Sequence, residues 1–342
     1  MKKISSLLLL ALSLNSFGQE INFVPKWKKG DTRKVIIKSE TRKNKKNSSE
    51  LEIESKDFEA KLKVKEVESD HYIIDLVYKD FYLNLFNKVN KSTGTEPKTF
   101  DKLNLQFKIN KDGSDADLLN WEDARNVMKK TFESSLDGLI DKYGKDGNEE
   151  KNGKDGNDNK DVDTVKKIFS PLLKMWDSKE MMESYFDDEI KALIIPFQDS
   201  FSTDTVKSTK LAHNPFGKSK NDSISSTRLS WINSKNGDTY TLGTTDVVDM
   251  TEFSNMMKGV MKTLLGGFLK MMPDTNSTKY REKKAELDQM LDQIHFDIDV
   301  KESLTFDDKT SFVKIYRRDT KSEGSMMGKA FKTTGWVQIE FE

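Results

Sequence analysis

The candidate for metal chemistry is a short alternating run that contains His295, Asp297 and Asp299. Alternate side chains of an extended strand share one face, so an imidazole and two carboxylates would lie together, opposite Phe296 and Val300. Such a donor set suits zinc or another divalent ion. The solvated face of an amphipathic strand has the same composition. The pattern leaves both interpretations open, a metal site and a wet strand face.

Two further patterns suggest catalysis or nucleotide binding. Asp187, Asp188 and Glu189 offer clustered carboxylates for glycoside-type acid–base chemistry, but neighbouring residues of a helix point in different directions. Residues 212–219 match a permissive phosphate loop, yet loop or strand residues follow where a helix should begin. The chain has 3 histidines, no cysteine and no Gly-x-Ser-x-Gly elbow. We therefore assign no catalytic residue.

The strongest apolar pattern runs from Asp249 to Met272. Its apolar residues recur at i, i+3, i+4 and i+7 for roughly five turns, which predicts an amphipathic helix. Asp249 and Glu252 form a plausible capping box, and Pro273 ends the helix. We expect this helix to lie on a sheet as ordinary core, and the alternatives are the lining of an apolar ligand site and an interaction face. The residues assigned to that lining are Phe253, Met256, Met257, Val260, Met261, Leu264, Leu265 and Phe268.

Strands precede and follow this helix. Apolar and polar residues alternate along residues 58–64 and 72–78, which indicates strands with one wet face. Together with earlier strands near residues 35 and 51, they predict an antiparallel meander. The elements predicted after it are a strand at 103–109, a helix from Trp121, helices between 165 and 193 ending before Pro196, strands over 201–248 with a turn at Asn236-Gly237, the helix from Asp249, a helix at about 279–294, and strands near 296–300, 312–317 and 336–341.

The order of these elements predicts the fold class. It reads strands, helix group, strands, helix pair, strands, which favours antiparallel α+β over alternating α/β. We expect a large curved antiparallel sheet packed by amphipathic helices on its concave face.

The first 18 residues have the features of a secretory signal peptide. Lys2 and Lys3 precede a short apolar segment, and Ser16 and Gly18 suit a cleavage site. No later stretch is apolar for long enough to span a bilayer. The absence of cysteine rules out a lipid-modified N-terminus and disulfides. These features predict an exported protein, periplasmic or extracellular, with residues 19–342 as a single domain.

Residues 144–163 differ from their surroundings because they are rich in Gly, Asp, Asn and Lys. A calcium loop starting at Asp155 would place Lys160 where glycine is required and Lys166 where glutamate is required. We predict a disordered insert here. The formal net charge of the chain is zero, which argues against a dedicated nucleic-acid binder.

The leader ending Asn-Ser-Phe-Gly-Gln-Glu, the early Lys-Gly-Asp, and Asn-Lys-Asp-Gly before Asn-Trp-Glu resemble uncharacterised exported proteins of the Bacteroidota. The element order also resembles the curved-sheet lipoprotein carriers of the periplasm, which implies helices over an apolar concavity. We expect a non-catalytic binding or accessory protein of the cell envelope, with no cofactor and with an envelope protein or an apolar small molecule as partner. A lipid carrier and an extracytoplasmic hydrolase are the alternatives.

Overall fold

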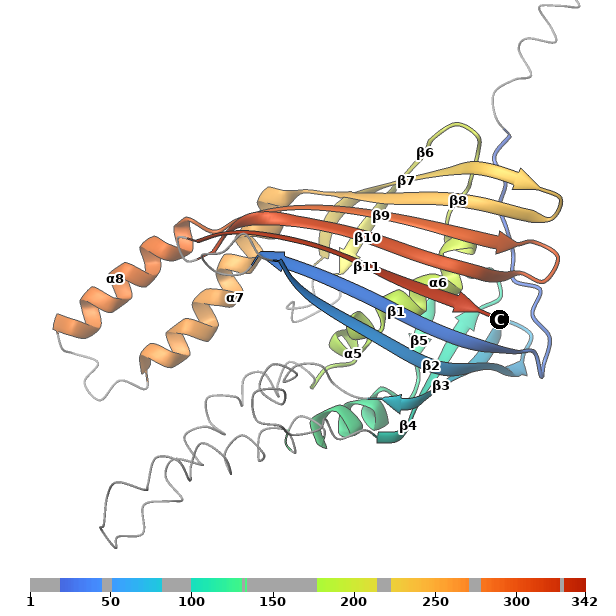
Figure 1. The fold of residues 1–342 in the computed structure, drawn as a ribbon, viewed down its shortest axis with the longest axis horizontal. Helices are drawn as coiled ribbons and strands as arrows, with labels where there is room; N and C mark the ends of the chain where they lie inside the picture. The colour runs from blue at the N-terminus through green and yellow to red at the C-terminus, as the bar shows by residue number, and fades with distance from the viewer. Residues whose placement is uncertain are drawn as a thin grey trace, which may run out of the picture.

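The computed structural model describes residues 19–44, 51–81, 100–130, 133, 177–213, 223–270, 278–326 and 329–342. Within these residues the strands form one antiparallel 11-stranded sheet in the order β5-β4-β3-β2-β1-β11-β10-β9-β8-β7-β6 (Figure 1). The strands are β1 Thr32–Asn44, β2 Leu51–Val67, β3 His71–Phe81, β4 Phe100–Asn110, β5 Ala116–Leu118, β6 Val206–His213, β7 Ser223–Asn236, β8 Thr239–Val248, β9 His295–Asp307, β10 Phe312–Met326 and β11 Lys329–Phe341.

The chain fills this sheet in two halves. It starts at the centre with β1, moves outward to β5, crosses to the opposite edge at β6 and returns to β11. The first and last long strands therefore pair with each other, from Val35 opposite Phe341 to Lys43 opposite Thr333. Helices interrupt this path at residues 121–130, at α5 Lys179–Tyr185 and α6 Asp187–Gln198, and at α7 Met250–Lys270 and α8 Thr278–Asp292. The antiparallel α+β prediction is confirmed, with the sheet dominant.

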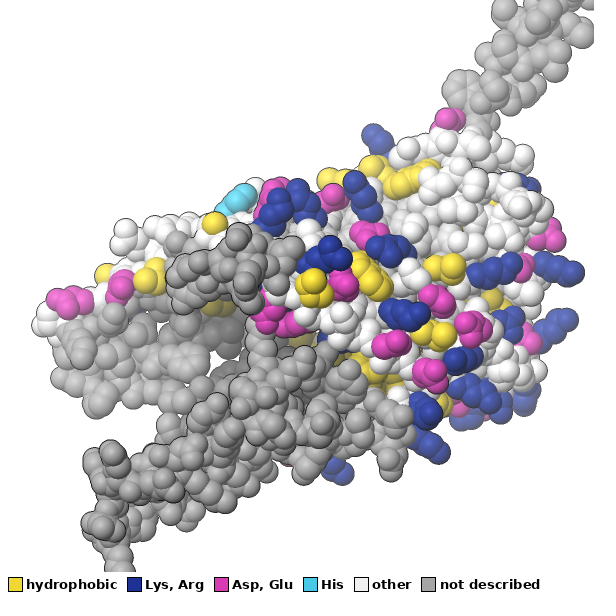
Figure 2. Space-filling view, in the orientation of Figure 1, with side chains coloured by type: hydrophobic (Ala, Val, Ile, Leu, Met, Phe, Trp, Pro, Cys, Tyr) yellow, Lys and Arg dark blue, Asp and Glu magenta, His cyan; other side chains and the backbone are white. Residues whose placement is uncertain are grey.

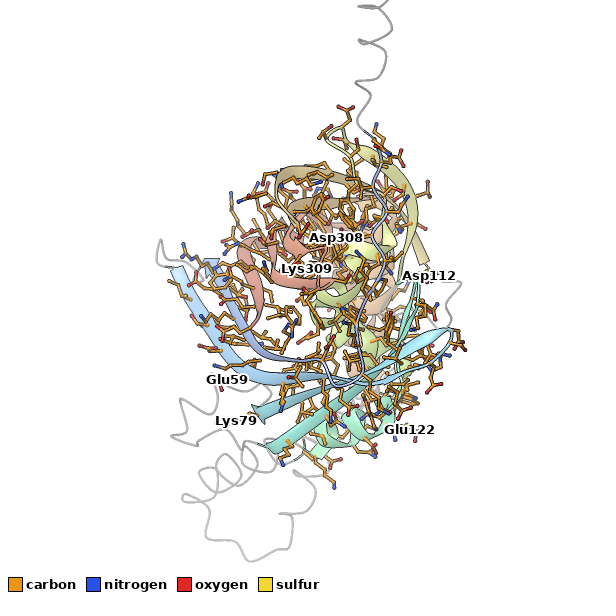
Figure 3. The ribbon with its side chains drawn as sticks, turned by 90° about the vertical axis from the view of Figure 1, so that its right-hand side faces the viewer. Glu59, Lys79, Asp112, Glu122, Asp308 and Lys309 are labelled. Atoms are coloured by element: carbon orange, nitrogen blue, oxygen red, sulfur yellow. The ribbon has the colours of Figure 1, made fainter. Side chains whose placement is uncertain are left out.

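The sheet is curved, and its core lies on the concave side (Figure 3). Leu62, Val64 and Leu76 point inward and are fully or nearly fully buried, whereas Lys61 and Lys63 are exposed. The period-two pattern thus separates the two faces as predicted. The outer face, turned to the viewer in Figure 2, carries interspersed basic and acidic side chains.

Helix α6 covers the middle of the concave face. Its buried residues include Leu193, Ile194, Ile195 and Phe197. The predicted helix ended before Pro196, but α6 continues through this proline to Gln198. A proline inside a helix costs about 3 kcal/mol. Burial of the apolar side chains on either side, worth roughly 1.5–3 kcal/mol each, offsets that cost.

The segment before β1 fills the concave face beside the C-terminal end of α6. Phe23 and Trp27 are buried there, and the Trp27 indole N–H donates to the Ser311 carbonyl at 2.8 Å. The Trp27 ring meets Phe197 edge-on, with ring centroids 5.5 Å apart. Ile21 adds a backbone bridge to Phe201. These contacts join the start of the chain to α6 and to the second half of the sheet.

Helix α7 starts where the sequence predicted and occupies a different place. Asp249 accepts hydrogen bonds from the backbone N–H groups of Thr251 and Glu252, at 2.9 and 3.1 Å, and so caps the helix. The expectation that this helix covers the sheet is corrected, because α6 takes the concave face. Helices α7 and α8 form a hairpin that projects past the end of the strands (Figure 1). None of the described helices has both the length and the apolarity needed to cross a bilayer.

The leader at residues 1–18, the phosphate-loop match at 212–219 beyond His213, and the insert at 144–163 lie outside the described residues. The leader, the insert and the single-domain assignment of residues 19–342 stay predictions.

Candidate functional site

A network of charged side chains lies between α6 and the inner faces of β7 to β10. Its first part is built on Asp188, in the first turn of α6, where the positive end of the helix dipole favours acids. Asp188 accepts a hydrogen bond from the Arg318 guanidinium at 2.8 Å and from the Tyr316 hydroxyl at 3.3 Å. Burial raises the pKa of Asp188 above its usual value, although Arg318 opposes the shift.

Glu189, the next residue, points to a different part of the sheet. Its carboxylate accepts a hydrogen bond from the Tyr78 hydroxyl of β3. Burial, with the charge of Asp188 as a second cause, raises the pKa of Glu189 to about 7. Burial also holds the pKa of the Tyr78 hydroxyl well above its ordinary value, so this group stays protonated and donates. Glu189 is therefore a carboxyl group that takes up a proton near neutral pH.

Glu302 of β9 is the centre of the network and is only 3% exposed. Its carboxylate lies 3.3 Å from the Lys191 ammonium of α6 and 3.5 Å from the Arg228 guanidinium of β7. It also accepts from the Thr244 hydroxyl at 2.8 Å, and the Tyr316 hydroxyl, whose one proton is shared between Asp188 and Glu302, lies 3.1 Å away. Burial alone would raise the pKa of Glu302, but the two cations lower it below its usual value. Glu302 is held ionised.

Arg228 links this centre to the far end of the network. Its guanidinium donates twice to Asp246, at 2.8 and 2.6 Å, and once to Asp199 at 3.4 Å. Asp199 lies 3.0 Å from the Lys210 ammonium. Burial would lower the pKa of Arg228, but its acidic partners raise it above the usual value. Arg228 and Asp199 are both nearly fully buried, so every charge here needs its partner.

The arrangement can exchange protons and hold α6 in place. Asp188 and Glu189 face different partners, as expected for consecutive helical residues, and do not form a facing carboxylate pair. The hollow beside Glu189 is too small to hold a water molecule. It is lined by aliphatic and aromatic side chains, including Leu62, Leu76 and Leu193.

The predicted metal residues share a face of β9. His295, Asp297 and Asp299 are all exposed on the outer side, and Phe296 between them is buried on the inner side. The Asp299 carboxylate lies 3.7 Å from the Lys301 ammonium. Among the described residues, no group of three His, Cys, Asp or Glu side chains is arranged to hold a metal ion. Metal binding at these positions stays a prediction.

The predicted ligand-lining residues extend along α7, and those whose side chains are described lie in its half nearer the sheet. Phe253, Met257 and Met261 are partly buried against a small apolar cluster separate from the main core. The ring of Phe253 meets that of Phe296 edge-on, with centroids 5.7 Å apart. The cluster also contains Met250, Leu291, Ile294 and Phe331. The side chains of Met256, Val260, Leu264, Leu265 and Phe268 lie outside the described residues. Ligand binding here stays a prediction.

The fold and these two sites define the chain as an open-sheet α+β protein with a charged interior and a projecting helical hairpin. No protein-family model and no curated protein matches it, and its likeness to exported Bacteroidota proteins stays a prediction. Among solved structures it is similar to one on lipid–protein interactions in lipovitellin, with a TM-score of 0.38 and 6% identity. The match covers 93% of this chain, which spans 25% of the lipovitellin chain. A likeness of that strength carries no argument about ligand.

Proposed function

We propose that this chain is an exported, non-catalytic binding or accessory protein of the cell envelope that meets its partner through the α7–α8 hairpin. The observation that supports this most directly is the partly covered cluster at the base of the hairpin. Phe253, Met257 and Met261 pack there outside the main core, on a helix pair that projects beyond the sheet. A helix face with this composition and position suits contact with another surface.

The interior network supports a binding role over a catalytic one. A catalytic acid must reach its substrate, either directly or through one water molecule. The Glu189 carboxyl is engaged by Tyr78, and on the side of the aliphatic hollow it meets no water, although part of the residue is exposed. We therefore assign the network a structural role, which is to fix α6 on the concave face.

The carrier function remains as a second candidate because the cluster around Phe253 is apolar and incompletely covered. A fatty or other apolar ligand would extend this cluster between α7 and the ends of β9 and β11. Native mass spectrometry of the gently purified protein tests this alternative, since a carrier retains an added mass that organic extraction removes. A single peak at the mass of the chain alone argues against the carrier.

Cell fractionation tests the proposed function. The complete chain should be found in the envelope, shortened by the mass of residues 1–18, and a form lacking those residues should stay in the cytoplasm. Met261→Glu should release the exported protein from the envelope pellet, because it places a charge in the apolar cluster around Phe253 at the base of the hairpin. Leu119→Glu is the matched control, since Leu119 is exposed on the body of the protein at 41%. Unprocessed, cytoplasmic protein would refute the proposal.

A further inference from the structure

Charge is segregated along the α7–α8 hairpin. Helix α7 leaves the sheet and α8 returns to it, so residues 262–270 and 278–284 form the end furthest from the sheet (Figure 1). These two stretches contain one acidic residue, Glu282, and the basic residues Lys262, Lys270, Lys279, Arg281, Lys283 and Lys284. The halves nearer the sheet carry the acids Glu252, Glu286, Asp288 and Asp292. A chain with zero net charge thus has a strongly basic projecting end.

The placement of charge on α8 opposes the dipole of that helix. Acidic residues stabilise a helix near its N-terminus and basic residues near its C-terminus. Helix α8 has no acidic residue in its first turn and no basic residue in its last turn, and its basic residues lie in its first half. Helix α7 has the favourable order, with Glu252 in its first turn. The stability of α8 therefore does not explain the basic end.

The same end carries apolar residues between its lysines. In the sequence, Leu264, Leu265 and Phe268 stand between Lys262 and Lys270, and their spacing is that of an amphipathic helix. A basic amphipathic helix of this kind is typical of segments that lie at a membrane surface. An anionic bilayer offers both negative charge and an apolar boundary, while a dissolved polyanion offers only the charge.

We propose that the end of the α7–α8 hairpin docks on an anionic lipid bilayer. Lys262, Arg281 and Lys284, which are all exposed, meet the lipid phosphates. This inference rests on the proposed envelope function, because it names the surface that the hairpin meets. The charged network under α6 takes no part in it.

Flotation of the purified complete chain with lipid vesicles tests the proposal. The vesicles are either equal parts phosphatidylglycerol and phosphatidylcholine, or phosphatidylcholine alone, each at low and high salt. We expect the protein to float with the anionic vesicles at low salt and to be released by high salt. Replacement of Lys262, Arg281 and Lys284 by glutamine should weaken binding about 5-fold for each charge, and about 100-fold in total.

A matched control removes three exposed charges from the body of the sheet instead. Lys61, Lys63 and Lys79 are exposed on the outer face of β2 and β3, and their replacement by glutamine changes the net charge by the same amount. This variant should float like the unchanged protein. Circular dichroism melting of both variants shows whether the fold is retained.

Three results would overturn the proposal. They are equal flotation with neutral and anionic vesicles, an equal loss in the hairpin and control variants, and binding to a dissolved sulfated polysaccharide without flotation. If flotation fails while Met261→Glu still releases the protein from the envelope, lipid docking is refuted and the proposed function stands with a protein partner. If the complete chain does not reach the envelope, the proposed function itself fails.

Discussion

Replacement of Glu189 by glutamine should stabilise the protein above neutral pH and leave its stability in acid unchanged. The pKa of Glu189 is raised from 4.5 to about 7 by burial and by the charge of Asp188. Between pH 4.5 and about 7 the Glu189 carboxyl therefore keeps its proton in the folded state and has lost it in the unfolded chain. Below pH 4.5 the group has no effect on the free energy of unfolding. Between pH 4.5 and about 7 the free energy of unfolding falls as the pH rises, and above pH 7 it stays at the lower value.

The size of this loss follows from the shift. Each pKa unit corresponds to about 1.4 kcal/mol, so a shift from 4.5 to about 7 sets an upper limit near 3.5 kcal/mol. Glu189 is only partly buried, and solvent screening reduces the effect, so we expect about 2 kcal/mol. Glutamine cannot ionise, and its amide oxygen still accepts the hydrogen bond of Tyr78.

Urea unfolding at pH 5 and pH 8, followed by tryptophan fluorescence, measures the difference. The variant should gain well under 1 kcal/mol over the unchanged protein at pH 5 and about 2 kcal/mol at pH 8. The control is Glu122→Gln, because Glu122 is exposed on the helix at residues 121–130 (Figure 3). A variant whose advantage is the same at both pH values would refute the reasoning, since removal of a titrating group must change the slope.

Three other substitutions test the buried charged network and two glycines with positive φ. Arg228→Met should cost about 3–5 kcal/mol in a urea melt, because it leaves the buried Glu302 carboxylate with one cation fewer. Gly113→Ala should cost more than 2 kcal/mol by the same measurement, since the added Cβ would lie 2.1 Å from the Cβ of Phe197 and the backbone φ is +72°. Gly237→Ala, with φ of +58° and nothing within 4 Å, should cost only about 1 kcal/mol, which separates strain from collision.

The sequence predicted the sheet better than it predicted which helix covers it. Alternation along β2 and β3 placed Leu62 and Leu76 inside because the period of a strand is local and strict. The apolar pattern of α7 is longer than that of α6, yet α6 lies on the concave face. A helical pattern shows that a face must be covered, but does not specify the surface that covers it. The break at Phe186 between α5 and α6 also left no signal that the pattern could detect.

One member of the charged network, Glu302, can be predicted from the alternation of inward and outward residues along β9. On β9 the inward positions include Phe296, Leu304 and Phe306, and Glu302 stands in the same register. A charged residue at an inward position must find a partner, which predicts a buried cation nearby. The identity of that cation depends on the pairing of β7, β8 and β9 and on α6, and distant segments such as these are not related by local spacing. The sequence therefore did not predict Arg228 and Lys191 as the partners of Glu302, and only the structure identifies them.

The two sides of the concave face explain why α6 carries both aliphatic and charged residues. Toward β1, β2 and β3 the helix presents Leu193, with Glu189 one turn earlier, to aliphatic neighbours. Toward β9 and β10 it presents Asp188 and Lys191 to Arg318 and Glu302. A rotation or a one-turn shift of α6 would bring Asp188 or Lys191 against the aliphatic side without a partner, at a cost of several kcal/mol. Buried ion pairs add little net stability over apolar packing, so their effect here is to select one position of α6 among those that its aliphatic residues alone would allow.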